Sequence, residues 1–248
     1  MKKVINWLNT KIGQAVFWTV FPVVAFVILS ALIKFLMMYF VQFFNDWQNI
    51  VANPIFVAFY TVIFYLSLLA VLYFVPTKIL KMKLTKESLG VSKEMTWSDM
   101  ALGFVGFVVS MILAGILTAI LTALFPTFNA SQAQNLGFGG LVRPHEFAIA
   151  FACVVLLPSI IEELIFRGII YGETRKINFW FAIILTSVLF GAAHQQLNVA
   201  VTTFAMSLVM CWTREKLTES IWAGVVLHFI KNSVAFVIIY ILPNLMLG

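Results

Sequence analysis

The sequence of 248 residues has little charge, because charged residues make up 10% of it against about 25% in an average soluble domain. Apolar residues make up 62%, and the mean hydropathy is +1.01. So little polar surface cannot cover a globule in water, which excludes an ordinary soluble enzyme, a disordered chain and a collagen-like fibre. The composition therefore predicts an integral membrane protein.

Cysteine is scarce as well. Cys153 and Cys211 lie in apolar runs without Cys-x-x-Cys spacing, which excludes a disulfide scaffold and a paired-cysteine motif. The net charge is +6, but the sequence has little of the basic, water-facing surface that nucleic-acid binding needs. We therefore expect membrane lipids around the chain and no nucleic-acid partner.

Long apolar segments dominate the sequence, and a membrane-spanning helix needs about 20 such residues. Seven candidates lie at 14–38, 54–76, 99–125, 147–172, 178–195, 198–212 and 220–243. The sixth is short, and an eighth span arises if the last segment breaks near Asn232. The predicted fold class is all-α, a polytopic transmembrane helical bundle with seven or eight spans.

Basic residues predict the orientation of these spans. With the amino terminus inside, the outer loops hold only Arg143, whereas the inner loops hold Lys2, Lys3, Lys11, Lys78, Lys81, Lys83, Lys86, Lys93, Arg175, Lys176, Arg214 and Lys216. This asymmetry predicts a multi-pass protein of the cell membrane with a cytoplasmic amino terminus. Short basic loops and a compact length favour a bacterial source.

The chain is expected to have two parts. Residues 1–98 hold two leading transmembrane helices and a basic cytoplasmic loop at 77–98, and residues 99–248 hold a helical core. The end of the loop at Ser98 and Asp99 predicts a helix start there.

A few ionisable residues interrupt the apolar segments. Because charge inside a bilayer is costly, each is a candidate functional residue. The fourth segment carries Glu162, Glu163 and Arg167, the fifth ends at His194, and the seventh holds His228, Lys231 and Asn232.

The two glutamates of the fourth segment have different expected roles. Glu163 and Arg167 are four residues apart and can form an ion pair on one helix face, whereas Glu162 is rotated by about 100°. One carboxylate is thus a counter-ion and the other is left for a different use, such as general base catalysis. The alternative is a buried ion cluster that only holds helices together.

The histidines allow alternatives when each is taken alone. His194 can be a capped residue near the membrane surface, and His228 with Asn232, on one face of the seventh segment, can merely bridge helices. Together with Glu162 they form a plausible set for activating water and binding an oxyanion. With a rise of 1.5 Å per residue, His228 lies about 13 Å and His194 about 25 Å from the inner ends of their segments. A common site therefore needs a tilted or broken helix, or different boundaries.

Three motifs occur in order on these segments: Glu162-Glu163-x-x-x-Arg167, Phe190-x-x-x-His194 and His228-x-x-x-Asn232. The chain therefore resembles the CPBP family, named for CAAX proteases and bacteriocin-processing enzymes and also called the Abi family. The resemblance covers residues 99–243, and the two leading helices match only as hydrophobic spans. It identifies 99–248 as a CPBP/Abi-like catalytic core.

The resemblance implies an intramembrane endopeptidase of the glutamic type, similar to CAAX prenyl endopeptidases, that works without a cofactor. It implies that Glu162 and His194 activate a water, and that His228 and Asn232 stabilise the oxyanion. Glu163, Arg167 and Phe190 would support the site. The expected partner is a peptide or lipidated-peptide substrate, such as a CAAX-type tail or a bacteriocin or signal-peptide precursor.

Two alternatives remain open. In one, Glu162, His194 and His228 bind a catalytic zinc ion, a His₂Glu set that suits such a site, although no His-Glu-x-x-His motif is present. In the other, the chain is a non-enzymatic bacteriocin-immunity or scaffold protein, or a small transporter. The sequence makes no prediction of oligomeric state.

Overall fold

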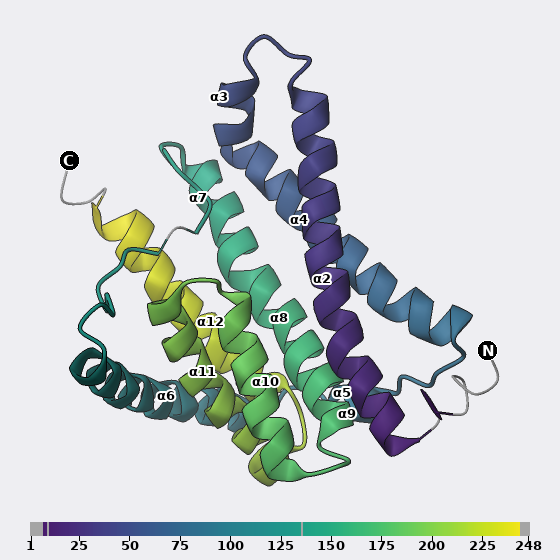
Figure 1. Ribbon diagram of the computed structural model, residues 1–248. Helices are drawn as coiled ribbons and strands as arrows, with labels where there is room; N and C mark the ends of the chain where they lie inside the picture. The colour runs from purple at the N-terminus through teal and green to yellow at the C-terminus, as the bar shows by residue number, and fades with distance from the viewer. Residues whose placement is uncertain (1–6, 9, 135, 244–248) are drawn as a thin grey trace. The chain divides into compact units, whose positions relative to one another are not determined.

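The computed structural model describes residues 7, 8, 10–134 and 136–243, and every regular element in this part of the chain is helical (Figure 1). The α-helices are α2 (Lys11–Val41), α3 (Trp47–Ala52), α4 (Pro54–Phe74), α5 (Lys86–Leu89), α6 (Trp97–Leu124), α7 (Pro144–Phe151), α8 (Leu157–Glu163), α9 (Gly172–Thr174), α10 (Phe179–Ala193), α11 (Leu197–Thr213) and α12 (Trp222–Phe236). π-helical segments are η1 (Val75–Ile79), η2 (Ala152–Leu156), η3 (Leu164–Tyr171), η4 (Arg214–Thr218) and η5 (Val237–Ile241). The predicted all-α class is confirmed.

In the described part of the chain, five helical stretches are long and apolar enough to cross a membrane, so the chain is a multi-pass membrane protein. They are Lys11–Val41, Pro54–Ile79, Trp97–Leu124, Pro144–Thr174 and Trp222–Ile241. The fifth and sixth predicted segments are helical but shorter, since α10 has 15 residues and α11 has 17. At 1.5 Å per residue such helices fall short of a hydrocarbon core of about 30 Å. The last segment does not break near Asn232, because α12 continues through it.

Side-chain caps fix where several helices begin. Asn53 accepts a hydrogen bond from the Ile55 amide, and Pro54 takes the first position of α4, where its missing N–H costs nothing. The α6 helix begins at Trp97, slightly before the predicted start, because Thr96 is its N-cap and forms a capping box with Asp99. Asp99 is therefore the third helical residue and not the start.

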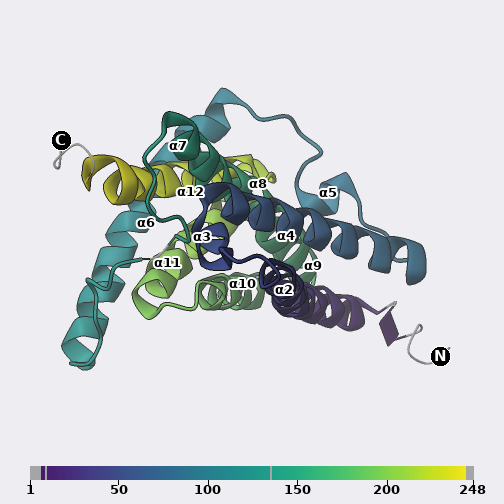
Figure 2. The ribbon, with the colours of Figure 1, turned by 90° about the horizontal axis from the view of Figure 1, so that it is seen from above.

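The chain forms two compact units, each built from three separate stretches. The first contains Met1–Thr19, Leu84–Gln134 and Glu162–Lys231, and the second contains Val20–Lys83, Asn135–Ile161 and Asn232–Gly248. In the first unit α10 and α11 pack side by side, joined by a short turn (Figure 2), and α6 packs against α11. Met206, Met210 and Leu227 form a buried cluster there.

Small residues line the inner face of α6. Gly103, Gly106, Ser110 and Ala114 are buried, while large apolar side chains on the same helix are exposed, including Phe104, Val108, Ile112 and Ile116. This arrangement suits a helix in lipid, where apolar side chains need not be hidden and small residues allow close approach of helices.

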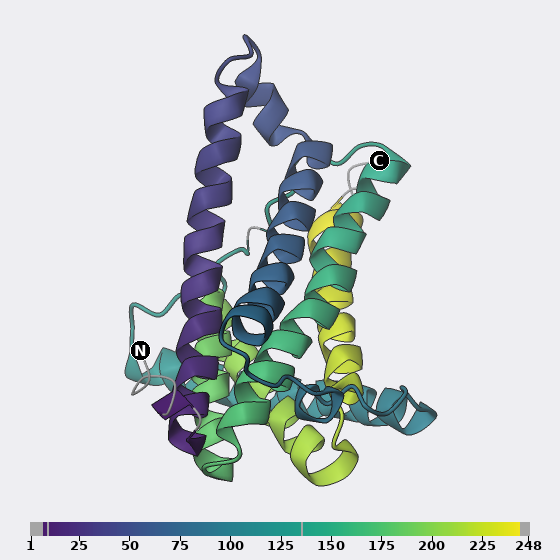
Figure 3. The same ribbon diagram turned by 90° about the vertical axis from the view of Figure 1, so that its right-hand side faces the viewer.

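In the second unit, α4 lies between α7 and the part of α2 that belongs to this unit, residues 20–41 (Figure 3). The rings of Phe26 and Phe64 meet edge to face with centroids 5.2 Å apart. Phe151, at the end of α7, and Phe236, at the end of α12, make a similar contact at 5.4 Å. Aromatic packing therefore joins α2 to α4 and α7 to α12 within this unit.

We predict that Gly103→Ala lowers the melting temperature of the purified protein in detergent. A Cβ at this position would lie 2.6 Å from Val226 Cβ and 2.9 Å from the Ala223 carbonyl oxygen, so α6 and α12 would have to move apart. Gly115→Ala on the same helix is the matched control, because nothing lies within 4 Å of its Cβ. Equal melting temperatures for the two variants would contradict the close packing of α6 on α12.

Candidate active site

The fourth apolar segment changes its helical form around the two glutamates. Glu162 and Glu163 end α8, with the π-helical segment η2 before this helix and η3 after it. A π-helix hydrogen-bonds each residue to the fifth along the chain, and such segments often occur at functional sites. The glutamates therefore lie on a short α-helical stretch between two irregular ones.

The predicted ion pair between Glu163 and Arg167 is present. Arg167 Nη1 donates to Glu163 Oε1 at 2.8 Å, and both side chains are fully buried. The guanidinium also lies over the ring of Phe190, with Cζ 4.2 Å from its centroid. Each buried charge is thus offset by the other, and the ring adds a cation–π contact.

The buried pair also holds His228. Nδ1 of His228 lies 3.1 Å from Glu163 Oε1, and a carboxylate paired with an arginine can only accept a hydrogen bond. Nδ1 therefore carries a proton, and Nε2 points the other way. Gly224 on the same helix leaves room for this contact, since a Cβ there would lie 2.9 Å from Glu163 Oε2.

Glu162 faces the other side of the same imidazole. Its Oε2 lies 4.0 Å from Nε2 of His228, and its side chain is 21% exposed, whereas that of Glu163 is fully buried. The two adjacent carboxylates are thus divided as the helix geometry predicts: one is a counter-ion and the other faces a more accessible space.

His194 joins this group through Phe190. Its Nδ1 lies 2.8 Å from the carbonyl oxygen of Phe190, and because a carbonyl only accepts, Nδ1 must donate and the neutral ring presents Nε2 as a base. The ring of Phe190 contacts His194 and His228 edge to face, with centroids 5.1 Å and 5.6 Å away. The structure therefore brings Glu162, His194 and His228 together.

Asn232 belongs to the second unit. Its Nδ2 donates to the carbonyl oxygen of Val154, in η2, at 3.1 Å. On α12 it lies four residues after His228, as the motif requires. One of its two amide hydrogens is therefore used within its own unit.

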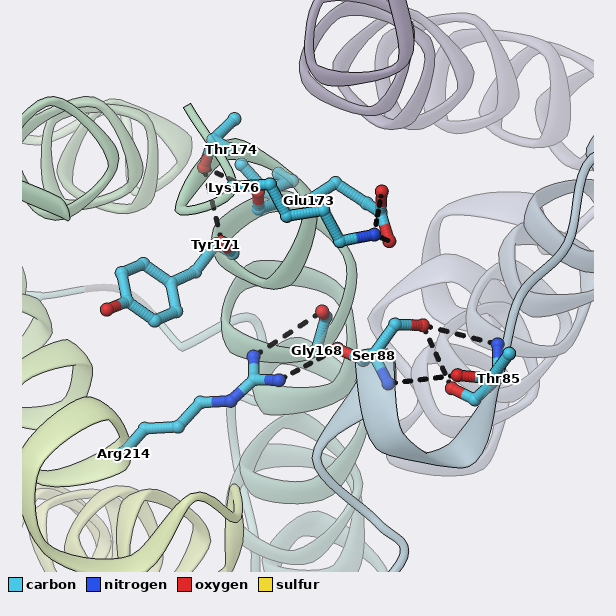
Figure 4. Close-up of polar contacts among 9 residues, drawn as sticks. Thr85, Ser88, Gly168, Tyr171, Glu173, Thr174, Lys176 and Arg214 are labelled. Atoms are coloured by element: carbon cyan, nitrogen blue, oxygen red, sulfur yellow. Dashed lines mark hydrogen bonds and ion pairs between the residues drawn. The ribbon is translucent and has the colours of Figure 1, made fainter. Parts of the chain in front are cut away.

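Arg214 supports the segment that carries the ion pair, and sequence analysis missed it. Figure 4 shows its guanidinium directed at two backbone carbonyls: Nη2 donates to Ser88 at 2.8 Å and Nη1 to Gly168 at 3.4 Å. The side chain is only 1% exposed. Gly172 lets the backbone of Ser88 approach closely, because a Cβ there would clash with the Ser88 carbonyl. The Gly-x-x-x-Gly spacing of Gly168 and Gly172 was the available signal for this contact.

Glu215, which follows Arg214 in the chain, adds further hydrogen bonds in this part of the unit. Glu215 accepts hydrogen bonds from the Tyr171 hydroxyl at 2.9 Å and from Arg175 Nη1 at 2.7 Å. Partial burial raises the pKa of Glu215, but these two hydrogen bonds outweigh it, so that the pKa is lower than usual. Hydrogen bonds of the Glu215 carboxylate thus join η4 to Tyr171 in η3 and to Arg175 after α9.

An apolar cavity of about 330 Å³ opens beside the histidine turn. It is lined by α6, α10 and α11, including Leu117, Leu121, Val188, Gly191, Ala192 and Phe204. Gly191 and Ala192 directly follow Phe190 and precede the turn that carries His194. Space for an apolar group therefore lies beside the end of α10 that precedes the His194 turn.

The described residues contain no group of three or more His, Cys, Asp or Glu side chains arranged to hold a metal ion. In the predicted zinc set, Nε2 of His228 lies 4.0 Å from Oε2 of Glu162.

We predict that Arg167→Met lowers the free energy of unfolding by about 3–5 kcal/mol, because it leaves the Glu163 charge buried without its partner. Reversible unfolding in mixtures of detergent and sodium dodecyl sulfate measures this change. Lys93→Met is the control, since the Lys93–Glu219 pair is exposed, with side-chain exposures of 59% and 72%, and its loss should cost much less. Equal losses in the two variants would contradict a structural role for the buried pair.

Comparison with known proteins supports the family assignment. Residues 144–234 match the family described as type II CAAX prenyl endopeptidase Rce1-like. This range contains all three motifs.

A relative in Bacillus subtilis (strain 168), described as "Putative membrane peptidase YdiL", is 35% identical to this chain over 85 residues. The match spans about a third of each protein, 34% of this chain and 34% of the relative. No solved structure matches the chain. Residues 144–234 therefore carry a domain of the Rce1-like type II CAAX prenyl endopeptidase family.

Proposed function

We propose that the chain is a membrane-embedded endopeptidase of the glutamic type that cleaves a membrane-associated or lipidated peptide. The observation that carries the proposal is the grouping of Glu162, His194 and His228, in which Glu163 and Phe190 fix both imidazoles so that Nε2 is the free nitrogen. The match to the family over residues 144–234 supports the same reaction.

In the proposed reaction, Nε2 of His194 accepts a hydrogen bond from a water molecule and orients it. Glu162 takes the other proton of this water as its oxygen attacks the scissile carbonyl carbon. The carbonyl oxygen becomes an oxyanion, which His228 can stabilise through Nε2 only as an imidazolium, with both ring nitrogens protonated and Nδ1–H still donated to Glu163. Asn232 is the second proposed donor to the oxyanion. The oxyanion then collapses to a carbonyl, the carbon–nitrogen bond breaks, and the proton held by Glu162 passes to the leaving amine.

The proposed substrate is an extended peptide with an apolar or lipidated portion, such as a CAAX-type tail or a bacteriocin or signal-peptide precursor. The apolar cavity beside Gly191 and Ala192 supports this, because it offers space for such a group next to the His194 turn. Nearly all of its surface is apolar, so we expect it to favour a hydrocarbon chain over a polar side chain.

We further propose seven or eight membrane segments, with α10 and α11 as the short ones, and a cytoplasmic amino terminus in a bacterial cell membrane. The excess of basic residues in the inner loops supports this orientation. The division into leading helices at 1–98 and a catalytic core at 99–248 belongs to the same proposal.

The proposal predicts that purified protein in detergent cleaves members of a fluorogenic peptide library that includes a farnesylated tail, and that Glu162→Gln and His228→Ala abolish cleavage. Glu162→Gln keeps the size of the side chain but removes its basicity. Glu94→Gln, an exposed glutamate outside the site, is the matched control and should leave the rate unchanged.

A chelator separates this proposal from a zinc peptidase that uses Glu162, His194 and His228. Cleavage that survives the chelator supports the glutamic mechanism, whereas loss on chelation and recovery with zinc assigns the site to a metallopeptidase. Cleavage that persists in Glu162→Gln would contradict both. A cellular function that Glu162→Gln leaves intact would instead favour the immunity, scaffold or transporter alternative.

A further inference from the structure

Lys231 is a charged residue near the middle of a membrane-spanning helix, and the proposed reaction does not use it. It is the tenth residue of the Trp222–Ile241 span. A lysine at this depth is costly, so such residues usually face the interior of the bundle and take part in function. Its position three residues after His228 places both side chains on neighbouring parts of one helix face.

The charge of Lys231 acts on the candidate catalytic residues Glu162 and His194. Its ammonium interacts electrostatically with Glu162, and both Glu162 and Lys231 act on His194. Among the described residues, the Lys231 ammonium takes part in none of the hydrogen bonds and ion pairs that hold Glu163, Arg167, His194, His228 and Asn232. Its donors are therefore not used to build the site.

The other basic side chains of this unit near the site are already committed. Arg167 is paired with Glu163 at 2.8 Å, and Arg214 donates to the carbonyls of Ser88 and Gly168. Lys231 is thus the cation next to Glu162 that retains donors for an incoming acceptor. An ammonium in an apolar setting binds a carboxylate more strongly than any neutral acceptor.

We propose that Lys231 is a specificity-determining residue that binds a carboxylate of the substrate close to the bond that is cut. This inference rests on the proposed peptidase function and adds the charge of the substrate to it. The carboxylate is either the free carboxyl terminus of the peptide or an acidic side chain near it, and the two sources present the same group to the ammonium.

The test uses three peptides that are identical except at their end: one with a free carboxyl terminus, one with a terminal amide, and one with a terminal amide and a glutamate as its last residue. Wild type should cleave the free acid with a kcat/KM about 10- to 100-fold above that of the amide, as expected for one charged hydrogen bond. Recovery with the glutamate peptide would assign the contact to a side-chain carboxylate.

Lys231→Met should remove the preference by lowering kcat/KM for the acid to that for the amide, whereas Lys231→Arg should retain most of it. Lys216→Met, at an exposed lysine of η4, is the control and should keep the wild-type preference. Equal rates for acid and amide in wild type would overturn the proposal. An equal loss for both peptides in Lys231→Met would also overturn it, because that pattern indicates a purely structural role.

A binding measurement keeps this inference separate from the proposed function. The acid and amide peptides, labelled with a fluorophore, are titrated into the Glu162→Gln and Glu162→Gln/Lys231→Met variants, and the dissociation constants are compared. Tighter binding of the acid that depends on Lys231 supports the inference even where no peptide is cut. Cleavage without any preference in rate or binding would leave the peptidase proposal standing and reject the role of Lys231.

Discussion

The buried ion pair between Glu163 and Arg167 is the interaction on which the candidate site depends. It places two opposite charges where both side chains are fully buried, and either charge alone would be strongly unfavourable there. Because Glu163 is committed to Arg167, it binds His228 as a fixed acceptor and determines which ring nitrogen faces Glu162. The guanidinium in turn lies over Phe190, whose ring contacts both histidines. One pair of charges thus orients three neighbouring side chains.

The candidate site also requires that neighbouring backbones approach each other closely. Glycine allows this at several points of the first unit. Gly224 admits the Glu163 carboxylate beside α12, Gly103 lets α6 approach α12, and Gly172 admits the backbone of Ser88. Arg214 then bonds the carbonyl of Gly168, one residue after Arg167. In lipid, where burial of apolar side chains gives little driving force between helices, such contacts and internal hydrogen bonds hold the helices together.

The sequence predicted the helical class, the Glu163–Arg167 pair and the different surroundings of Glu162, because these follow from composition and from spacing within one helix. The ordered motifs predicted that His194 and His228 belong to one site, although straight spans place the two histidines at different depths. Their contact through Phe190 depends on how α10 and α12 pack, which helical spacing alone does not determine. The sequence also treated Arg214 as an inner-loop charge, although it is 1% exposed. The π-helical segments that flank the glutamates had no signal in the apolar pattern.

The buried pair places the proton of His228 on Nδ1, and the Phe190 carbonyl does the same for His194. Both assignments can be measured by ¹⁵N NMR of histidine-labelled protein. The sequence has three histidines, so His194→Asn and His228→Asn variants suffice to assign the signals. We expect a protonated Nδ1 in both His194 and His228, and loss of this state for His228 in Arg167→Met. An unprotonated Nδ1 with a protonated Nε2 in His228 of the wild-type protein would contradict this assignment.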